Sequence, residues 1–560
     1  MHRSHRLFSA PLARQGLASK PIPKSSFASK LRYSTSRTVE APSSPSRVGS
    51  LAAAAISSAL AGYFAASLYN PSSPSVDTLV NPIYATKAKI QEAIKELEGL
   101  FPEGGVSTLD DVLKSHGFSI NSYHPSAPHS VVVFAHSTED VVKVVKIANK
   151  YLIPVTAFSG GTSLEGHYGG TPEVGGICID MSGMDSIIHI NEADSDMVVQ
   201  SGVKWEDINA TLEEKGIPLF FPLDPGPGAT IGGMIGTGCS GTNAVRYGTA
   251  KAEWFLNVTV VLPSGEVIKT RRRARKSSAG FDTTKLFIGA EGTLGIVTEA
   301  TLRLAPRLPT TVATVAFPDV RKAVDAVAEI VNAGVPIQCV ELLDDHMMHA
   351  LNVAGLADRK YPELDSLFFK FQGSKDTQRE ASATVKKIVE KHGGKGFQAA
   401  RDEKEAHDFW QNRKYALWST MALYPDSRVW TTDVAVPVSR LPELVLQTKE
   451  DLAQSGLKST IVGHVGDGNF HAFMIIRNEQ EMEPVKEAVH RLVHRALALD
   501  GTCQHRRTRS RSREKEYLIE ELGPGTVELM RTVKRAIDPH NLFNPGKLYP
   551  DVEVKPNKEH

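Results

Sequence analysis

The sequence is poor in cysteine and has almost no excess of either charge. Its four cysteines, at positions 178, 239, 339 and 503, are widely scattered and form no Cys-x-x-Cys pair, which argues against a disulfide framework. The net charge of +1 gives no reason to expect a nucleic acid as partner. The hydrophobic fraction of 41% is ordinary for a globular protein, and 560 residues exceed the size of one hydrophobic core. We therefore expect a globular protein of several domains.

Acidic residues are nearly missing from the first fifty residues. This segment has nine lysines and arginines, many serines and a single acid, Glu40. Such a composition is typical of a mitochondrial transit peptide, and residues 32–34 suit a cleavage site. A disordered basic tail is the alternative. We predict a transit peptide at 1–50 and hence a protein of the mitochondrion.

Charge is missing altogether from residues 51–69. About twenty apolar residues are needed to cross a bilayer, and the many alanines and serines make insertion of this segment marginal. It resembles the second half of a bipartite presequence, which stops in the inner membrane and leaves the protein facing the intermembrane space. We predict a transmembrane or sorting segment at 51–70. A soluble protein of the matrix, with an alanine-rich linker, is the alternative.

The rest of the chain alternates between helix and strand patterns. Apolar residues at a helical period predict a helix over residues 87–100, and the order strand, helix, strand follows over residues 131–158, with the start of the helix at Ser137 and Thr138. A Pro-Ser-Gly-Glu turn between residues 258–262 and 267–270 predicts a β-hairpin. From about residue 311 strands alternate with long amphipathic helices, so we place a domain boundary there. The expected fold class is α+β.

Three glycine-rich stretches are candidates for ligand binding. The first, SGGTS at 159–163, directly follows a strand, and adjacent glycines let successive backbone N–H groups point at one anion such as a diphosphate. Taken alone, a Gly-Gly turn is usually only a turn. The second stretch runs from 222 to 241, and the third, at 287–299, leads into a β-branched strand. So many glycines suggest backbone packed closely against a large flat ligand.

Residues 236–241, GTGCSG, match the Gly-x-Gly-x-x-Gly fingerprint of the Rossmann fold. That fingerprint must follow a hydrophobic strand and begin a long helix. Here residues 229–235 are interrupted by glycines, and residues 243–248 do not begin a helix with an apolar face. We therefore reject a Rossmann site.

In this order the three stretches resemble the FAD domain of the vanillyl-alcohol oxidase / p-cresol methylhydroxylase (PCMH-type) family. The resemblance covers about residues 125–306 and implies a PCMH-type FAD-binding domain of two subdomains, predicted at 123–308, with noncovalent FAD. Some members of the family attach FAD covalently to a histidine near the first loop, but His167 stands in a different context, so we expect no covalent link. The cofactor-binding residues implied by the resemblance are Ser159, Gly160, Gly161, Thr162, Ser163, Asp224, Gly232, Gly233, Thr237, Gly238, Ser240, Gly241, Ala244, Glu291, Gly292, Gly295, Ile296 and Val297.

Two histidines lie seven residues apart in HVGDGNFH at 464–471. The Gly-Asp-Gly-Asn between them forbids a helix, whereas a strand, turn and strand would aim both imidazoles inward. Two histidines and a carboxylate make a good site for Zn²⁺ or Mn²⁺, although a random histidine pair more often serves packing. The motif resembles the D-2-hydroxy acid dehydrogenases of the same family, in which the two histidines hold a divalent metal beside the flavin. His464 and His471 are therefore the predicted metal ligands.

The resemblance then extends over about residues 80–549. Residues 538–547 resemble the family's C-terminal ending, which returns to the FAD, so Asn544 joins the predicted cofactor site. The second domain, predicted at 309–549, should be an FAD-linked oxidase C-terminal domain, an antiparallel sheet flanked by helices. Arg413 matches in position the arginine that fixes the substrate carboxylate in the family, and capping of a helix is its alternative role.

These residue types suit the oxidation of a 2-hydroxy acid, in which a hydride leaves Cα for the flavin and the hydroxyl loses a proton. A cation bound to the hydroxyl lowers its pKa, a general base takes the proton, and an arginine fork fixes the carboxylate.

One stretch departs from the family. After residue 503 the family reads approximately TGEHGVGxGK, in which Gly-Glu-His-Gly supplies a third metal ligand and the base. This chain instead reads QHRRTRSRSRE from Gln504 to Glu514, with no glycine and no Glu-His pair. Codons for this stretch permit the family motif one base later, so we interpret it as a shifted reading frame between correct flanks. As written, the protein should bind FAD but turn its substrate over very poorly.

The expected function is FAD-dependent oxidation of D-lactate to pyruvate, with electrons passed to cytochrome c. D-2-hydroxyglutarate dehydrogenase shares these motifs but needs polar contacts for a second carboxylate, and the apolar residues 472–476 favour a shorter substrate. The Arg/Ser run at 504–513 raises an RNA-binding alternative, which ten residues in a neutral chain support only weakly. A flavin-binding protein without turnover is the third possibility.

Overall fold

The computed structural model describes residues 82–119, 127–171, 174–355, 359–503 and 516–549. The predicted transit peptide at 1–50 and the predicted membrane or sorting segment at 51–70 lie outside these residues. Within the described part of the chain, no helix is both long and apolar enough to cross a membrane.

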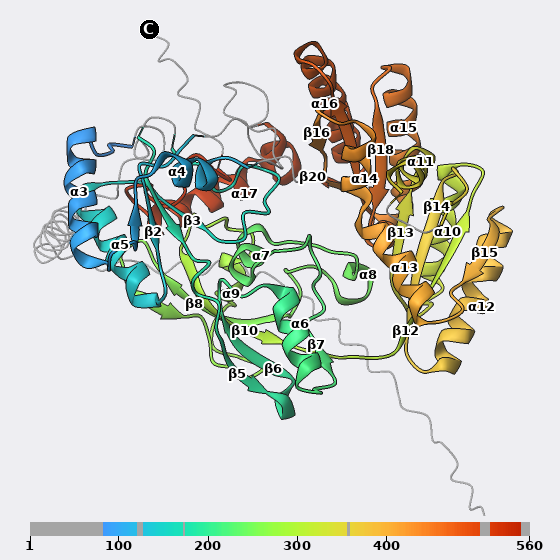
Figure 1. Cartoon of the computed structure of the whole chain (residues 1–560), viewed down its shortest axis with the longest axis horizontal. Coiled ribbons are helices and arrows are strands. Elements are labelled where there is room, and N and C mark those ends of the chain that lie inside the picture. Colours follow the sequence, from blue (N-terminus) through green and yellow to red (C-terminus); the bar gives the residue numbers. More distant parts are fainter. Residues whose placement is uncertain (1–81, 120–126, 172–173, 356–358, 504–515, 550–560) are drawn as a thin grey trace, which may run out of the picture. The chain divides into compact units, whose positions relative to one another are not determined.

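A small sheet between helices forms the first subdomain. Its elements are α3 (Lys87–Leu100), β1 (Val106–Ser107), α4 (Asp110–Gly117), β2 (Val131–Phe134), α5 (Thr138–Tyr151), β3 (Val155–Phe158) and β4 (Ile177–Asp180). The strand order is β1-β2-β4-β3, and β2 and β3 both run parallel to β4. Helix α5 begins after the predicted cap Ser137, whose hydroxyl accepts from the Asp140 N–H, and its apolar face shares a core with α3 (Figure 1).

A five-stranded antiparallel sheet forms the second subdomain. Its strands are β5 (Ile187–Asn191), β6 (Asp196–Gln200), β8 (Phe255–Val261), β9 (Val267–Lys269) and β10 (Ile296–Arg303). The order is β5-β6-β10-β8-β9, and the predicted hairpin is confirmed, because β8 pairs with β9 in antiparallel register. Helices α6 (Trp205–Glu214) and α7 (Ile231–Thr237) bury their apolar residues in the core of this subdomain.

A nine-stranded sheet with antiparallel pairing carries the second half of the chain, in the order β15-β12-β14-β13-β18-β19-β17-β20, with β16 paired to β19. Its strands are β12 (Thr310–Ala316), β13 (Ile337–Leu343), β14 (Ser366–Gln372), β15 (Lys395–Ala399), β16 (Arg428–Thr431), β17 (Val434–Ala435), β18 (Ser459–Gly463), β19 (Asn469–Ile476) and β20 (Thr502–Cys503). Four helices share a core with one face of the sheet, α10 (Val320–Asn332), α12 (Lys375–Lys391), α15 (Leu441–Gln454) and α16 (Met482–Ala498). Three helices share a core with the other face, α11 (Asp345–Ala354), α13 (Glu403–Lys414) and α14 (Ala416–Leu423). The α+β class and the antiparallel sheet flanked by helices are thus confirmed.

The C-terminal segment returns to the first subdomain. After α17 (Glu516–Ile537), Phe543 forms a parallel bridge with Val155 of β3, and the Asn544 N–H donates to the Val155 carbonyl at 2.8 Å. Phe543 is completely buried in the core of the first subdomain. The end of the described chain therefore lies beside the strand that leads into the first glycine loop.

Candidate active site

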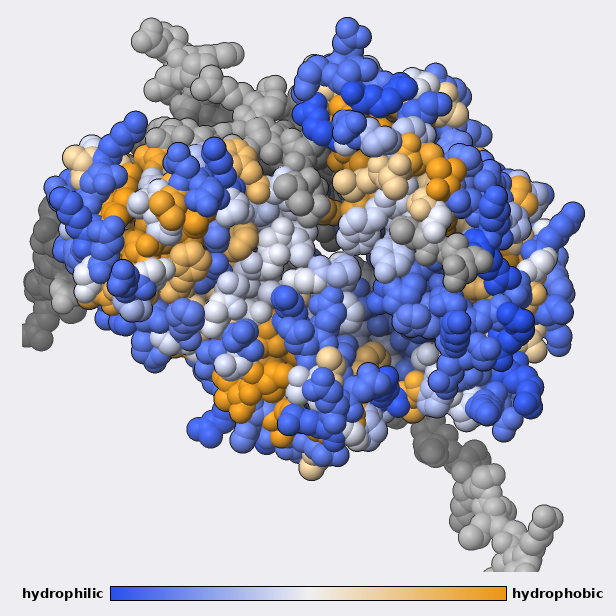
Figure 2. Space-filling view, viewed as in Figure 1, coloured by the Kyte–Doolittle hydropathy of each residue, from blue (hydrophilic) through white to orange (hydrophobic). Residues whose placement is uncertain are grey.

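A cavity of about 1360 Å³ is lined by the glycine loops and by residues of strands β16 to β20 of the nine-stranded sheet. This is larger than the usual 300–1,000 Å³ of a small-molecule pocket, so a large cofactor and a small substrate could share it. The space-filling view is hollowed near its centre, and the atoms around the hollow are mostly pale, as expected for glycine, serine and threonine (Figure 2). Every residue predicted for the cofactor, the metal and the substrate carboxylate lines this cavity.

The two sides of the cavity differ in the types of residue that line them. We call the side made by residues 157–168, 224–249 and 286–297 the glycine wall. We call the opposite side the charged wall, which consists of Arg413, Asp433, His464, Asp467 and His471.

Glycines of the first loop are required by packing and by backbone conformation. A Cβ on Gly160 would lie 2.4 Å from the carbonyl oxygen of Gly228, and Gly161 has a φ of +63°, which lies in the left-handed region. The Tyr168 hydroxyl donates to the Gly161 carbonyl at 3.3 Å. The loop is therefore held in a shape that other residues would adopt only with strain.

Buried hydroxyls on and beside the glycine wall lack hydrogen bonds. Four such serine and threonine oxygens that line the cavity have no partner among the described residues, those of Ser159, Ser201, Thr230 and Ser240. Buried polar atoms are nearly always paired in folded proteins. A ligand rich in phosphate and hydroxyl oxygens would pair them, so the wall fits FAD.

The second glycine stretch differs from its expected form. Although residues 229–235 are rich in glycine, α7 forms there, because Gly232 lets the helix approach Ser201, where a Cβ would come within 2.8 Å of the Ser201 Cβ. The GTGCSG motif then ends this helix at Gly238, which has a φ of +65°, instead of beginning one. This geometry supports the rejection of a Rossmann site.

Asp224 holds the loop that follows. Its carboxylate accepts from the Thr242 hydroxyl at 2.5 Å and from the Asn243 N–H at 3.0 Å, and a Cβ on Gly241 would lie 2.5 Å from one carboxylate oxygen. Burial raises the pKa of Asp224 above its ordinary value. Although Asp224 lines the cavity, its hydrogen bonds show that it shapes the 240–244 loop.

The C-terminal return clamps the third glycine stretch. The Asn544 side-chain amide donates to the carbonyls of Glu291 at 2.8 Å and His167 at 3.0 Å. Lys534, only 1% exposed, donates to the Thr293 carbonyl at 2.8 Å and is paired with Asp538. His167 also lines the cavity.

A buried acid organises the charged wall. Glu341 of β13 is completely buried and accepts from Nε of Arg413 at 2.8 Å, from Nη2 of the same side chain, and from Nδ1 of His464 at 2.8 Å. Burial alone would raise the pKa of Glu341, but Arg413 and His464 outweigh it and hold that pKa below its ordinary value. Burial lowers the pKa of His464, and Glu341 more than reverses this effect, so the pKa is raised.

His464 and His471 lie on a strand, turn and strand, and their ring centroids are 5.4 Å apart. Nδ1 of His471 donates to the Thr432 carbonyl at 3.0 Å, as Nδ1 of His464 does to Glu341. With the proton on Nδ1, the Nε2 lone pair of each ring is available to a metal. Asp467 nearby has a buried carboxylate oxygen without a partner among the described residues, and burial raises its pKa to about 6. Two imidazoles and a carboxylate are donors that suit a divalent ion, although the ligand atoms of these three residues do not all lie within 4.8 Å of one another.

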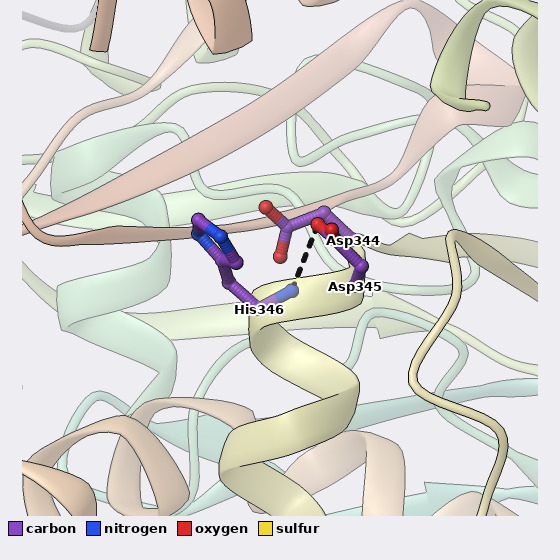
Figure 3. A group of neighbouring side chains, drawn as sticks. All are labelled: Asp344, Asp345 and His346. Carbon is purple, nitrogen blue, oxygen red and sulfur yellow. Dashed lines mark hydrogen bonds between the residues drawn. The ribbon is translucent and has the colours of Figure 1, made fainter. Parts of the chain in front are cut away.

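A second group of acids lies at the start of α11 (Figure 3). The ligand atoms of Asp344, Asp345 and His346 lie within 4.8 Å of one another. However, Asp344 caps the helix by accepting from the Met347 N–H at 2.8 Å, and the Lys449 ammonium lies 2.7 Å from Asp345. These carboxylates are already used, so the group does not compete with the two histidines as a metal site.

Residues 504–514 lie outside the described residues. Those described on either side of them, Thr502 and Cys503 before and Tyr517 and Leu518 after, all line the cavity. The four cysteines, all among the described residues, form no disulfide, as expected.

Glu341 was missed by the sequence analysis. Its signal is a lone acid within the apolar strand IQCVELL, every residue of which is buried. A charge in such a strand needs a buried partner, but the sequence does not say which one.

Two family models match this chain. The FAD binding domain matches residues 128–271, and the C-terminal domain of FAD linked oxidases matches residues 309–548.

Relatives match most of the chain. D-lactate dehydrogenase (cytochrome), mitochondrial, of Kluyveromyces lactis is 42% identical over 86% of this chain and 84% of that protein, and the Arabidopsis thaliana protein of the same name is 41% identical over 82% and 80%. Glycolate oxidase subunit GlcD of Bacillus subtilis is 29% identical over 81% and 96%.

Among solved structures, p-cresol methylhydroxylase shares the fold, with a TM-score of 0.66 and 18% identity over 83% of this chain and 97% of that one. The 4-ethylphenol oxidase of Gulosibacter chungangensis has a TM-score of 0.70 at 17% identity, over 84% of this chain and 99% of that one. The chain therefore belongs to the PCMH-type family of FAD-linked oxidases, in the group of the mitochondrial D-lactate dehydrogenases (cytochrome).

Proposed function

We propose that this protein oxidises D-lactate to pyruvate with FAD and passes the electrons to cytochrome c. The observation that carries the proposal is the placement of Arg413, His464 and His471 on one side of a cavity whose other side fits FAD. The names of the relatives support the same substrate and acceptor. FAD, when bound, supplies the hydride acceptor for such an oxidation.

Arg413 binds the carboxylate of the substrate. Glu341 occupies Nε and Nη2, whereas Nη1 has no hydrogen-bond partner among the described residues. A guanidinium held along one edge presents its remaining N–H groups in a fixed direction, which orients the substrate before reaction. The alternative role of capping a helix receives no support, because its bonds go to β13 and not to the carbonyls of α13.

His464 and His471 hold a divalent cation, Zn²⁺ or Mn²⁺, which would lower the pKa of the substrate hydroxyl. The chain as written lacks the Gly-Glu-His-Gly of the family, so the third ligand and the base are missing. Loss of a general base costs about 10²–10⁴-fold in rate. We therefore expect slow turnover.

Fewer residues than expected from the apolar stretch 472–476 support the preference for a short substrate. Of residues 472–476, only Phe473 lines the cavity, whereas Ala472, Met474 and Ile476 belong to the core on the opposite face of the sheet. Phe473 and Val462 suit the methyl group of lactate. Lys414 also lines the cavity and offers a cation to a second carboxylate, so D-2-hydroxyglutarate is the second candidate.

Reduction of cytochrome c by the purified protein tests this function. D-lactate should support reduction with a higher kcat/KM than D-2-hydroxyglutarate, and L-lactate should be inert. A preference for D-2-hydroxyglutarate would assign the second function, and no reduction with any 2-hydroxy acid would leave a flavin protein without turnover. Acid precipitation should release the FAD into the supernatant, which tests the noncovalent link.

For its place in the cell, we propose the mitochondrial inner membrane with the protein facing the intermembrane space. The apolar segment at 51–70 and the mitochondrial relatives support this location. Protease treatment of mitochondria with a ruptured outer membrane should degrade the protein, whereas protection would favour the matrix. The domain limits 123–308 and 309–549 also stay proposals, to be tested by limited proteolysis near residue 308.

A further inference from the structure

Glu341 is a charged side chain in the middle of a buried strand. Its neighbours on the same face of β13, Cys339 and Leu343, pack in an apolar core. A buried carboxylate is costly unless its partners and their geometry compensate. Both oxygens of Glu341 are in fact used, Oε2 by Nε and Nη2 of Arg413 and Oε1 by Nδ1 of His464.

We propose that Glu341 is a positioning residue that fixes Arg413 and His464 together, and so sets the distance between the carboxylate site and the metal site. The proposal rests on the roles given to these two residues under the proposed function. Glu341 does not line the cavity, so it acts through its two partners and not on the substrate.

The two histidines differ in what holds them. The Nδ1 proton of His471 goes to the backbone carbonyl of Thr432, which every residue type at that position would supply, and the Asp433 carboxylate lies 3.6 Å away, beyond hydrogen-bond distance. The Nδ1 proton of His464 goes to the Glu341 side chain alone. Carboxylates behind metal-binding histidines fix the tautomer and raise the basicity of the ligand, and their loss usually costs 10–100-fold in metal affinity.

Arg413 depends on the same carboxylate. Its guanidinium is bound along one edge, and the structure gives it no other hydrogen-bond partner among the described residues. Without Glu341 the buried cation would lose its only charged partner, and the direction of its free N–H groups would no longer be fixed. One change in β13 should therefore weaken binding of the metal and of the substrate carboxylate.

Glu341→Gln tests the proposal in the FAD-loaded protein. Glutamine has the same shape, but its amide NH₂ cannot accept from Arg413. We expect Zn²⁺, measured by calorimetry in the absence of substrate, to bind about 10–100-fold more weakly. The KM for D-lactate should rise more than kcat falls, and the FAD content should stay unchanged.

Asp344→Asn is the matched control. It changes a buried acid just beyond the end of β13, whose carboxylate accepts from the N–H groups of Met347 and Ile461. This variant should lose stability but keep the Zn²⁺ affinity and KM of the wild type. Glu341→Asp is the substitute variant in case the glutamine variant does not fold. It keeps the negative charge but moves it back by one methylene, so its Zn²⁺ affinity should lie between that of the wild type and that expected for Glu341→Gln.

Equal Zn²⁺ affinity and equal KM in wild type and Glu341→Gln would overturn this proposal and leave the proposed function intact. Wild-type protein that binds no Zn²⁺ would contradict the metal site itself, and with it the part of this proposal that concerns His464. An equal loss of Zn²⁺ affinity in Asp344→Asn and Glu341→Gln would mean that Glu341 stabilises the fold without positioning Arg413 and His464.

Discussion

The two walls of the cavity recognise ligands by different means. The glycine wall offers backbone and hydroxyl groups, with glycines where a Cβ would clash or where φ is positive. The charged wall offers ionisable side chains, and its arginine and one of its histidines are held by a single buried acid. Ligand binding at the glycine wall depends on the absence of side chains, whereas binding at the charged wall depends on the charges of its side chains.

This difference predicts that cofactor binding can be lost separately from metal or substrate binding. A bulky residue in the glycine wall should cost the protein its cofactor, because the backbone can no longer approach it. A lost charge on the opposite wall should cost metal or substrate binding and leave the flavin in place. Variants of the two kinds should therefore show whether the two walls act independently.

The largest effect is expected from Gly161→Val in the glycine wall. The variant should purify without FAD, because a branched residue at a φ of +63° strains the loop that approaches the diphosphate. The ratio of absorbance at 450 nm to that at 280 nm measures the loss. Gly216→Val, at a φ of +68° with no atom within 4 Å of the added Cβ, is the control and should keep its FAD. A full flavin complement in Gly161→Val would remove this loop from the cofactor site.

Replacement of residues 504–514 by the family motif should raise kcat for D-lactate by about 10²–10⁴-fold, because the motif restores the base and a metal ligand. FAD content should not change. Sequencing of the transcript across codons 500–516 is the companion test. A confirmed message with the present frame, translated into a fully active enzyme, would contradict both the frame hypothesis and the roles given to the motif.

On the charged wall, His464→Ala combined with His471→Ala should lower Zn²⁺ affinity by more than about 100-fold, since direct ligands matter more than the groups behind them. The variant should keep its FAD. His189→Ala, which removes an exposed histidine on β5, should change neither. Metal content equal to that of the wild type would exclude the two histidines as ligands.

The smallest effect concerns a neutral histidine behind the glycine wall. Burial lowers the pKa of His129 to about 4, whereas an unfolded histidine titrates near 6.5. Because the folded state binds fewer protons, this term of stability is present above pH 6.5 and is lost as the pH falls toward 4, by about 2 kcal/mol at pH 5.

The free energy of unfolding of wild type and His129→Gln should therefore converge between pH 7.5 and 5. Glutamine keeps a donor for the Tyr168 carbonyl, to which His129 now donates at 2.8 Å. The pKa of His116 is shifted in the opposite direction, because Asp180 holds it above the ordinary value despite burial. Both proteins contain His116, so its contribution cancels in the difference between their free energies of unfolding. A constant difference between the two proteins across this range would contradict the assignment.

Local patterns predicted the helices of the first subdomain, whose strand β3 leads into the first glycine loop. The helix expected at 87–100 has those bounds, and Ser137 caps α5 as expected, because a helical period and a cap are decided within a few residues. Helix α7 was not expected, because its glycines are tolerated only through packing on Ser201, which lies about thirty residues earlier.

The charged wall could be predicted only in part. Its two histidines lie in one motif, but Glu341 meets Arg413 across 72 positions and His464 across 123. The same limit applies to Lys534, whose bond to Thr293 spans 241 positions. Pairings of this kind are decided by the fold and leave only a weak local sign, such as a lone acid in an apolar strand.

Taken together, the two walls hold FAD and D-lactate in one cavity, with the flavin on the glycine wall and the substrate on the charged wall. An anaerobic titration of the purified protein, followed by its visible spectrum, is the most direct test of this arrangement. We predict a bound flavin whose 450 nm band is bleached slowly and completely by D-lactate and is left unchanged by L-lactate. A protein without flavin, or a flavin that stays oxidised in excess D-lactate, would contradict the account.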